Sequence, residues 1–239
     1  MCTILTVTKD KYDDKIKAQV EADTMNGNSD GYCLVLANEF GEIVSNLRSM
    51  TLEPILAALE FSEWYRMFLH SRLATGSSDV SITNTHGWGS NQYIYMHNGF
   101  IRDRAAKNLD VDSQLIGKWL EGGVDFCVKQ MQQEPYANVF LIDTVGPEFY
   151  VSRSKDNTLY TDGDGCYSTN KVGPINKKVR KNSDHTHVIG NPEVKPEPTK
   201  KDEWETEWSR WDEYREEYAF TDLVDEMNLL STNFAKGSK

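Results

Sequence analysis

The sequence predicts an α+β protein built around antiparallel β-sheet, and three observations lead to this fold class. Short runs of apolar, β-branched or aromatic residues, bounded by charged or turn-forming residues, are typical of buried strands. These runs occur before and after a group of helix-like segments, an order that favours a layered architecture. The 239 residues are 38% apolar and 26% charged, which is typical of a globular chain.

The first half of the chain contains three expected strands and one expected helix. Residues 2–8, 32–37 and 93–96 have the composition of buried strands. Residues 52–69 carry apolar side chains at spacings of three and four, and Pro54 is compatible with a first helical turn. We therefore expect a helix there.

Two helices and three strands are expected next. The helices cover residues 112–121, which end at a Gly-Gly pair, and residues 124–132. The strands are expected at residues 138–143, 148–152 and 158–161. Gly146 and Pro147 suit a reversal between the first two of these strands.

The composition changes after residue 171, which predicts the domain organisation. Residues 172–201 contain four prolines among many lysines, as an irregular linker does. Residues 202–239 are acidic and aromatic, with tryptophans close to one helical face. We expect a domain over residues 2–171, a linker over 172–201 and a C-terminal helical extension over 202–239. The extension either docks on the domain, self-associates as an oligomer contact, or binds a partner protein.

Charge, cysteine usage and the N-terminus exclude several classes of function. The net charge of −11 disfavours nucleic-acid partners, and no apolar run is long enough for a membrane span. Four widely spaced cysteines without a CxxC pair disfavour zinc and suit a reducing compartment. The N-terminus lacks the features of a secretory signal. We expect a cytoplasmic protein with no metal and no cofactor.

Cys2 is the first candidate for chemistry. Processing removes an initiator methionine when the next residue is small, which would expose a cysteine with a free α-amine. An α-amine has a pKa of about 7.7 to 8.0, so it can accept the thiol proton near neutral pH. One residue would then supply both nucleophile and base. The alternative is an ordinary strand residue.

Three further segments carry candidate residues. Asn98 and Gly99 follow an expected strand and could offer an amide and a backbone N–H to an oxyanion, although Asn-Gly is also a hairpin signal. Arg72, set in small and apolar sequence, could hold a carboxylate or simply lie on the surface. Asp112 could bind an ammonium group, cap the helix that follows, or do both.

An ordered set of motifs resembles the glutaminase domain of class II glutamine amidotransferases, which are N-terminal-nucleophile (Ntn) hydrolases. The resemblance extends from Cys2 to about residue 171, and its last expected strand is Tyr167-Ser168-Thr169-Asn170. The motifs are Cys2, Ser29-Asp30-Gly31, Arg72-Leu73-Ala74-Thr75, His86-Gly87-Trp88, His97-Asn98-Gly99-Phe100-Ile101 and Asp112-Ser113-Gln114-Leu115-Ile116. The family's fold is a four-layer αββα sandwich of two antiparallel sheets.

The resemblance implies a role for each matching residue. Cys2 would be the nucleophile, its α-amine the general base, and Asn98 and Gly99 the oxyanion hole. Arg72 would bind the α-carboxylate of glutamine and Asp112 its α-amine. Three residues would line the pocket, namely Thr75, His86 and Gly87. The implied activity is that of a glutamine amidohydrolase, which forms a Cys2 thioester and releases ammonia.

The sequence departs from the family pattern in three ways, the first of which is Asn26-Gly27-Asn28 in place of the typical arginine-glycine string before the Asp-Gly turn. Gly76-Ser77 stands where many members have a histidine and a glycine after the arginine motif. The 68 residues after Lys171 do not suggest a domain that consumes ammonia, so the ammonia acceptor is expected on a partner protein. Two alternatives remain open: another Ntn amidase acting on a peptide or acyl amide, and a catalytically silent binding or regulatory protein of the same fold.

Overall fold

A computed structural model describes residues 2–25, 27–74, 79–90, 92–102, 109, 111–181 and 183–194. These residues fall within a unit that spans residues 1–195. The expected helical extension lies outside the described residues, as does the end of the expected linker. No helix in the described ranges combines the length and the apolar character that a membrane crossing requires.

The first sheet has seven antiparallel strands and contains the N-terminal strand near its middle. Strand β1 lies between β10 and β4, so both of its edges are hydrogen-bonded. The strands are, in spatial order, β11 (Lys177–Lys178), β9 (Tyr160–Thr161), β10 (Tyr167–Ser168), β1 (Thr3–Thr8), β4 (Arg66–Ser71), β2 (Tyr32–Ala37) and β3 (Ile43–Ser49).

The second sheet has five antiparallel strands. Strand β6 is its second strand from one edge and brings the Asn98-Gly99 motif toward the same end of the molecule as Cys2. The strands are, in spatial order, β12 (Ser183–Val188), β8 (Glu148–Arg153), β7 (Ala137–Asp143), β6 (Tyr93–Gly99) and β5 (Trp88–Ser90).

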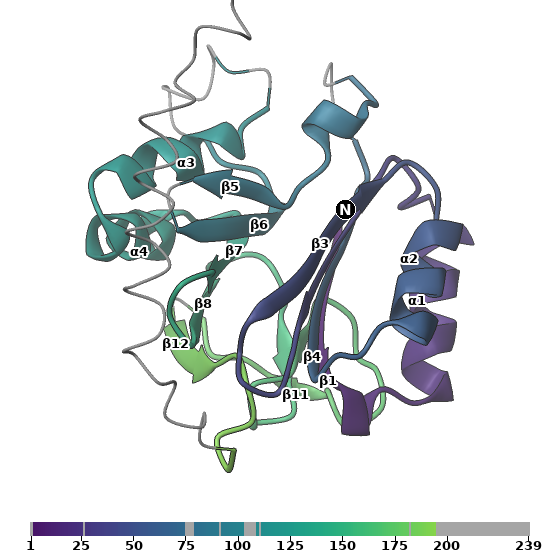
Figure 1. Ribbon diagram of the computed structural model, residues 1–239. Helices are drawn as coiled ribbons and strands as arrows, with labels where there is room; N and C mark the ends of the chain where they lie inside the picture. Colours follow the sequence, from purple (N-terminus) through teal and green to yellow (C-terminus); the bar gives the residue numbers. More distant parts are fainter. Residues whose placement is uncertain are drawn as a thin grey trace, which may run out of the picture. The chain divides into compact units, whose positions relative to one another are not determined.

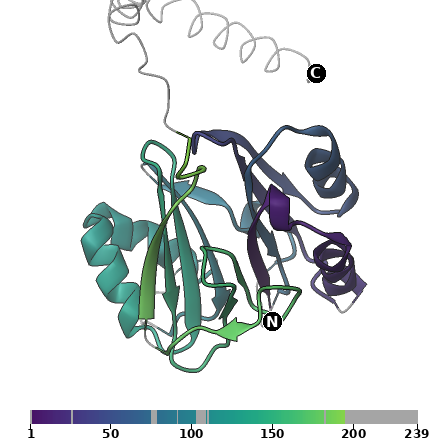
Figure 2. The ribbon, with the colours of Figure 1, turned by 90° about the horizontal axis from the view of Figure 1, so that it is seen from below.

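Four layers result, because helices cover the outer face of each sheet. Helices α1 (Asp14–Met25) and α2 (Glu53–Phe61) flank the first sheet, while α3 (Gln114–Glu121) and α4 (Val124–Gln133) flank the second (Figure 1). Seen from below, the two sheets face each other between these helices (Figure 2). This arrangement is the αββα sandwich that the resemblance implied.

Three apolar clusters hold these layers together. The central cluster joins the facing sides of the two sheets and includes Phe68 from β4 and Phe140 from β7, both fully buried. A second cluster packs Ile16 of α1 and Ile55 of α2 against the first sheet. A third packs α3 and α4, through residues such as Trp119, against the second sheet. Burial of apolar surface at about 25 cal/mol per Å² is the main term that stabilises such layers.

The helix expected over residues 52–69 is only half correct. Helix α2 ends at Phe61, and β4 begins at Arg66. All six residues of β4 are buried, because the strand lies between β1 and β2 and is covered on both faces. Its apolar residues Met67, Phe68 and Leu69 form one short run, which periodicity cannot distinguish from the last turn of a helix.

The linker expected from residue 172 is wrong for its first part. Strand β11 pairs with β9, and β12 pairs with β8 over six residue positions. Tyr167–Ser168 is therefore not the last strand. The sequence of β12 is polar because it forms the edge of its sheet and every second residue is exposed, which removes the apolar signal of a buried strand.

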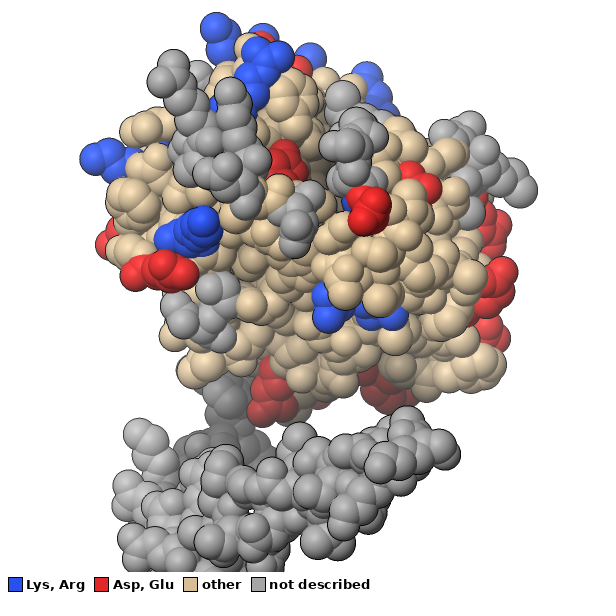
Figure 3. All heavy atoms as spheres, turned by 90° about the horizontal axis from the view of Figure 1, so that it is seen from above, with Lys and Arg blue, Asp and Glu red and all other residues tan. Residues whose placement is uncertain are grey.

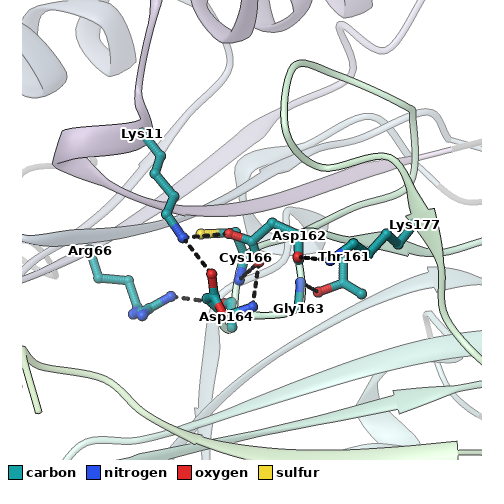
Figure 4. Close-up of polar contacts among 9 residues, drawn as sticks. Lys11, Arg66, Thr161, Asp162, Gly163, Asp164, Cys166 and Lys177 are labelled. Atoms are coloured by element: carbon teal, nitrogen blue, oxygen red, sulfur yellow. Dashed lines mark hydrogen bonds and ion pairs between the residues drawn. The ribbon is translucent and has the colours of Figure 1, made fainter.

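A polar turn between β9 and β10 anchors these short strands (Figure 4). Lys11 donates to Asp162 at 2.6 Å from the 3-10 helix η1 (Lys9–Lys11), which follows β1. Arg66, the first residue of β4, donates to the Gly165 carbonyl oxygen at 2.9 Å. The turn is thereby tied to the 3-10 helix that follows β1 and to the start of β4, which helps to fix β10 beside β1.

Candidate active site

A pocket of about 240 Å³ opens beside Cys2, where the two sheets meet. This volume is below the range of about 300–1,000 Å³ typical of drug-sized ligands, so the pocket suits a small molecule. Its described lining comes from segments far apart in the chain: Cys2, Arg72, Leu73, Ala74, Asn84, His86, His97, Gly99, Phe100, Val111, Asp112 and Asn157.

Cys2 precedes β1, and its thiol is partly buried on the pocket wall. The Leu73 backbone N–H donates to the sulfur at 3.4 Å. Burial raises the pKa of the Cys2 thiol above its ordinary value, and the Leu73 hydrogen bond and the positive charge of Arg72 offset only part of this rise. The thiol is therefore protonated at neutral pH and needs a base before it can act as a nucleophile.

Asn98 lies directly beneath Cys2. It is fully buried, its side-chain amide donates to the Cys2 carbonyl oxygen, and its own carbonyl oxygen Oδ1 has no hydrogen-bond partner among the described residues. Asn98 therefore contacts Cys2 but is not among the described residues that line the pocket. A buried polar atom without a partner is costly, which suggests that this side chain is held here for a reason other than stability.

Gly99 does line the pocket, and its position requires glycine. Its φ is +113°, a region that other residues rarely adopt. A Cβ atom at this position would overlap the Tyr136 carbonyl oxygen and the Asn157 side-chain amide. The close approach of these groups brings the backbone of residue 99 to the pocket wall.

Asn157 is a site residue that the sequence did not indicate. It lies in the segment after β8, is 8% exposed and lines the pocket. Its amide donates to the backbone carbonyl oxygens of Asn98, at 3.1 Å, and of Tyr136. Asn157 thus fixes the backbone that carries the Asn98-Gly99 motif. The two residues of this hydrogen bond are 59 positions apart in the sequence, so no local sequence signal indicates the role of Asn157.

Arg72 supplies positive charge to the pocket. Arg72 is 4% exposed, and its guanidinium donates to the backbone carbonyl oxygens of Asp79 at 3.1 Å and Asp30 at 3.5 Å. No carboxylate forms an ion pair with it in the described ranges. A buried charge without a counter-charge is unfavourable, so an anionic group of a ligand would be stabilised here.

Asp112 supplies negative charge at the same pocket. Its carboxylate accepts the Ile101 N–H at 2.7 Å and lies 3.6 Å from His97 Nε2. Burial alone favours the neutral acid, but His97 and the backbone N–H groups outweigh it, so the pKa of Asp112 lies below its ordinary value. The carboxylate is therefore ionised at neutral pH. The contact of His97 with Asp112 was not predictable from the sequence.

Three histidine rings are stacked at the pocket, and two of them, His86 and His97, line it. The ring centres of His70 and His86 lie 3.9 Å apart, and those of His86 and His97 lie 4.6 Å apart. His86 Nδ1 accepts the His97 backbone N–H at 3.2 Å, so the proton of a neutral His86 is on Nε2. Burial, with the neighbouring rings, lowers the pKa of His70 to about 3 and that of His86 well below its ordinary value. Both rings are neutral at physiological pH.

These buried histidines should make the protein sensitive to acid. The unfolded chain binds their protons near pH 6.5, whereas the folded chain binds one at His70 only near pH 3. Stability is therefore complete above about pH 6.5 and falls with pH below it, by about 1.4 kcal/mol per pH unit for each such histidine. Urea unfolding measured between about pH 7 and pH 5 checks this prediction.

His70→Gln is the matched variant, because glutamine can keep an N–H near the His97 carbonyl oxygen that His70 Nε2 contacts at 3.1 Å. We expect the dependence of unfolding free energy on pH to become shallower by about 1.4 kcal/mol per pH unit. Equal slopes in the variant and the parent protein would show that His70 does not titrate in this way.

The remaining residues from the sequence analysis lie elsewhere. Gly87, with a φ of +87°, packs against the Cys33 side chain and is not part of the described pocket wall. Its expected contact with substrate is therefore not supported. The positive φ of Gly87 instead sets the direction of the backbone directly after His86. Thr75 lies outside the described residues.

Comparisons with known proteins find a likeness of structure only. No protein-family model matches the chain, and no significant match occurs among curated proteins. Glutamine phosphoribosylpyrophosphate amidotransferase from B. subtilis, complexed with ADP and GMP, matches with a TM-score of 0.51 and 10% identity. A structure described as the allosteric regulatory enzyme of purine biosynthesis matches with a TM-score of 0.50 and 11% identity.

Each of these matches covers 80% of this chain and 49% of the solved chain, so this chain spans about half the length of those proteins. A glutamine aminotransferase class-II domain protein from Silicibacter pomeroyi also matches, with a TM-score of 0.41 and 11% identity over 79% of this chain and 99% of its own. The chain therefore has the fold of class II glutamine amidotransferases, an N-terminal-nucleophile hydrolase fold.

Proposed function

We propose that this protein hydrolyses the side-chain amide of glutamine, with Cys2 as the nucleophile. The observation that carries the proposal is the composition of one small pocket. Its wall contains a partly buried thiol, a buried guanidinium without a carboxylate partner in the described part of the chain, and an ionised carboxylate.

Glutamine fits this set of charges. Its α-carboxylate would pair with Arg72, whose planar guanidinium suits a carboxylate, and its α-ammonium would pair with Asp112. Held at both charged ends, the amino acid would extend its side-chain amide toward Cys2. On the end of the sandwich where the N-terminus lies, acidic and basic side chains are interspersed (Figure 3). The charges of Arg72 and Asp112 would therefore determine the orientation of the substrate.

The reaction requires the α-amine of Cys2, which is free only after Met1 is removed. The amine accepts the thiol proton, and the sulfur attacks the amide carbon. The side-chain amide of Asn98 and the backbone N–H of Gly99 stabilise the oxyanion. Ammonia leaves with the proton from the amine, and water then converts the γ-glutamyl thioester to glutamate.

The direct test is a glutaminase assay on protein whose mass confirms that Met1 is absent. We expect ammonia and glutamate in equal amounts, and labelling of Cys2 by the glutamine-like electrophile 6-diazo-5-oxonorleucine. The same protein with Met1 retained is the control and should be inactive, because its only available base is part of a peptide bond. Absence of both glutamate and label in the processed protein would refute the proposal.

Two broader expectations accompany this function. The described cysteines are all free thiols, which supports our proposal that the protein works in a reducing compartment such as the cytoplasm. We also propose that the released ammonia is used by a partner protein, since glutamine hydrolysis alone yields no amidated product.

A further inference from the structure

A second pocket, of about 610 Å³, reaches Cys2 from another side. It shares Cys2, Leu73 and Asn157 with the first pocket and is otherwise separate from it. Its remaining described lining is Thr3, Gln19, Asn28, Asp156, Thr158, Thr169, Asn170 and Lys171. Hydrolysis needs only water at the thioester, so this pocket leaves room beside Cys2 for a second ligand.

The lining of the second pocket suits a polar ligand. Apart from Cys2 and Leu73, every described residue on its wall has a polar or charged side chain. The Thr169 hydroxyl is buried and has no hydrogen-bond partner among the described residues. Its volume lies within the range of about 300–1,000 Å³ that small-molecule sites occupy.

The charges on the wall indicate what kind of polar ligand fits. Lys171 and Asp156 are both exposed and have opposite signs. Lys171 offers the charge that a carboxylate needs, and its ammonium lies 5.6 Å from the centre of the Tyr160 ring. Asp156 offers the charge that attracts an ammonium, and it directly precedes Asn157, which both pockets share. Together the two charges match the two ends of a zwitterion.

We propose that this second pocket, here called the acceptor pocket, binds an amino acid or short peptide whose amino group takes over the γ-glutamyl group from Cys2. This inference rests on the proposed glutaminase function and deepens it. The chain would then act as a γ-glutamyl transferase as well as a hydrolase, and the binding pocket for the acceptor amine would lie on the same chain as Cys2.

The transfer is balanced without any further reactant. Attack of Cys2 on glutamine forms the thioester and releases ammonia. The ammonium of the acceptor first loses one proton, which leaves with the released ammonia as ammonium. The neutral amine nitrogen then bonds to the γ-carbonyl carbon, the carbon–sulfur bond breaks, and a second amine proton passes to the sulfur through the α-amine of Cys2. One glutamine and one amine give one γ-glutamyl amide and one ammonia.

The test uses processed protein, glutamine and increasing amounts of glycylglycine, with ammonia, glutamate and γ-glutamyl-glycylglycine measured separately. We expect the γ-glutamyl peptide to replace glutamate as glycylglycine rises. In Lys171→Met, the concentration needed for half-maximal transfer should rise by about fivefold, as expected for loss of one exposed charge pair. Ammonia release without glycylglycine should not change.

Two controls locate the effect. Lys178→Met removes an exposed lysine from β11, outside both pockets, and should leave transfer unchanged. Glycylglycine amide lacks the carboxylate, so Lys171→Met should not affect its use. Ammonia accompanied only by glutamate would refute the acceptor pocket while the glutaminase function stands. Transfer that is insensitive to Lys171→Met would refute this location, and absence of ammonia would refute both proposals.

Discussion

Cys2→Ala protein is expected to release no measurable ammonia from glutamine. The substitution removes the sulfur that forms the thioester, and no other group takes its place, because the remaining described cysteines are buried away from the pocket. Without a nucleophile the thioester cannot form, so ammonia release should fall to the background of the assay. The measurement is a coupled ammonia assay at saturating glutamine.

Folding should be preserved in this variant, which separates chemistry from stability. Cys2 precedes the first residue of β1 and belongs to none of the three apolar clusters. Circular dichroism and the melting temperature should therefore match those of the parent protein. The variant should also still bind glutamine, since Arg72 and Asp112 are unchanged. Ammonia release at the parental rate would rule out Cys2 as the nucleophile.

Asn98→Ala should lower kcat by about 10²–10³, the usual loss for one oxyanion-hole donor. The side chain lies under Cys2 and donates to the Cys2 carbonyl oxygen, so it is close to the position where the oxyanion would form. The KM for glutamine should change little, because neither Arg72 nor Asp112 contacts Asn98 in the described hydrogen bonds. Steady-state kinetics measure both quantities.

Asn98→Asp is the matched control for shape. It keeps the size of the side chain and replaces the donating amide with a carboxylate oxygen, so it should lose at least as much activity as the alanine variant. A thermal melt of each variant shows whether the buried position tolerates the change. An aspartate variant with near-parental kcat would mean that Asn98 fills space and does not stabilise charge.

The fold class could be predicted because buried strands and amphipathic helices have different periodicities. The strand expected at residues 32–37 has the observed bounds of β2, and the helix expected at 124–132 is α4. The errors have physical causes. The apolar residues of β4 form one short run that fits a strand or a helix, and exposure at a sheet edge left β12 without an apolar pattern. The place of each strand in its sheet would have decided both cases, and a sequence does not show that place.

The candidate site was predictable where chemistry and position coincide in one short motif. Cys2, Arg72 and Asp112 belong to such motifs, and the structure brings all three to one pocket. Asn157 and His97 act on their neighbours through contacts made only after folding, with the Asn98 carbonyl oxygen and the Asp112 carboxylate. The catalytic roles of Cys2 and Asn98 remain predictions that the variants above can test.

The position of β1 within its sheet affects when Met1 can be removed to expose the α-amine of Cys2. Leu5 pairs with Ser168, so one side of this strand is covered only after most of the chain has left the ribosome. At about 5–20 residues per second, that leaves on the order of ten seconds or more during which the nascent N-terminus has no such neighbour. An aminopeptidase travelling with the ribosome could remove the initiator methionine in this interval, before the sandwich closes around the thiol.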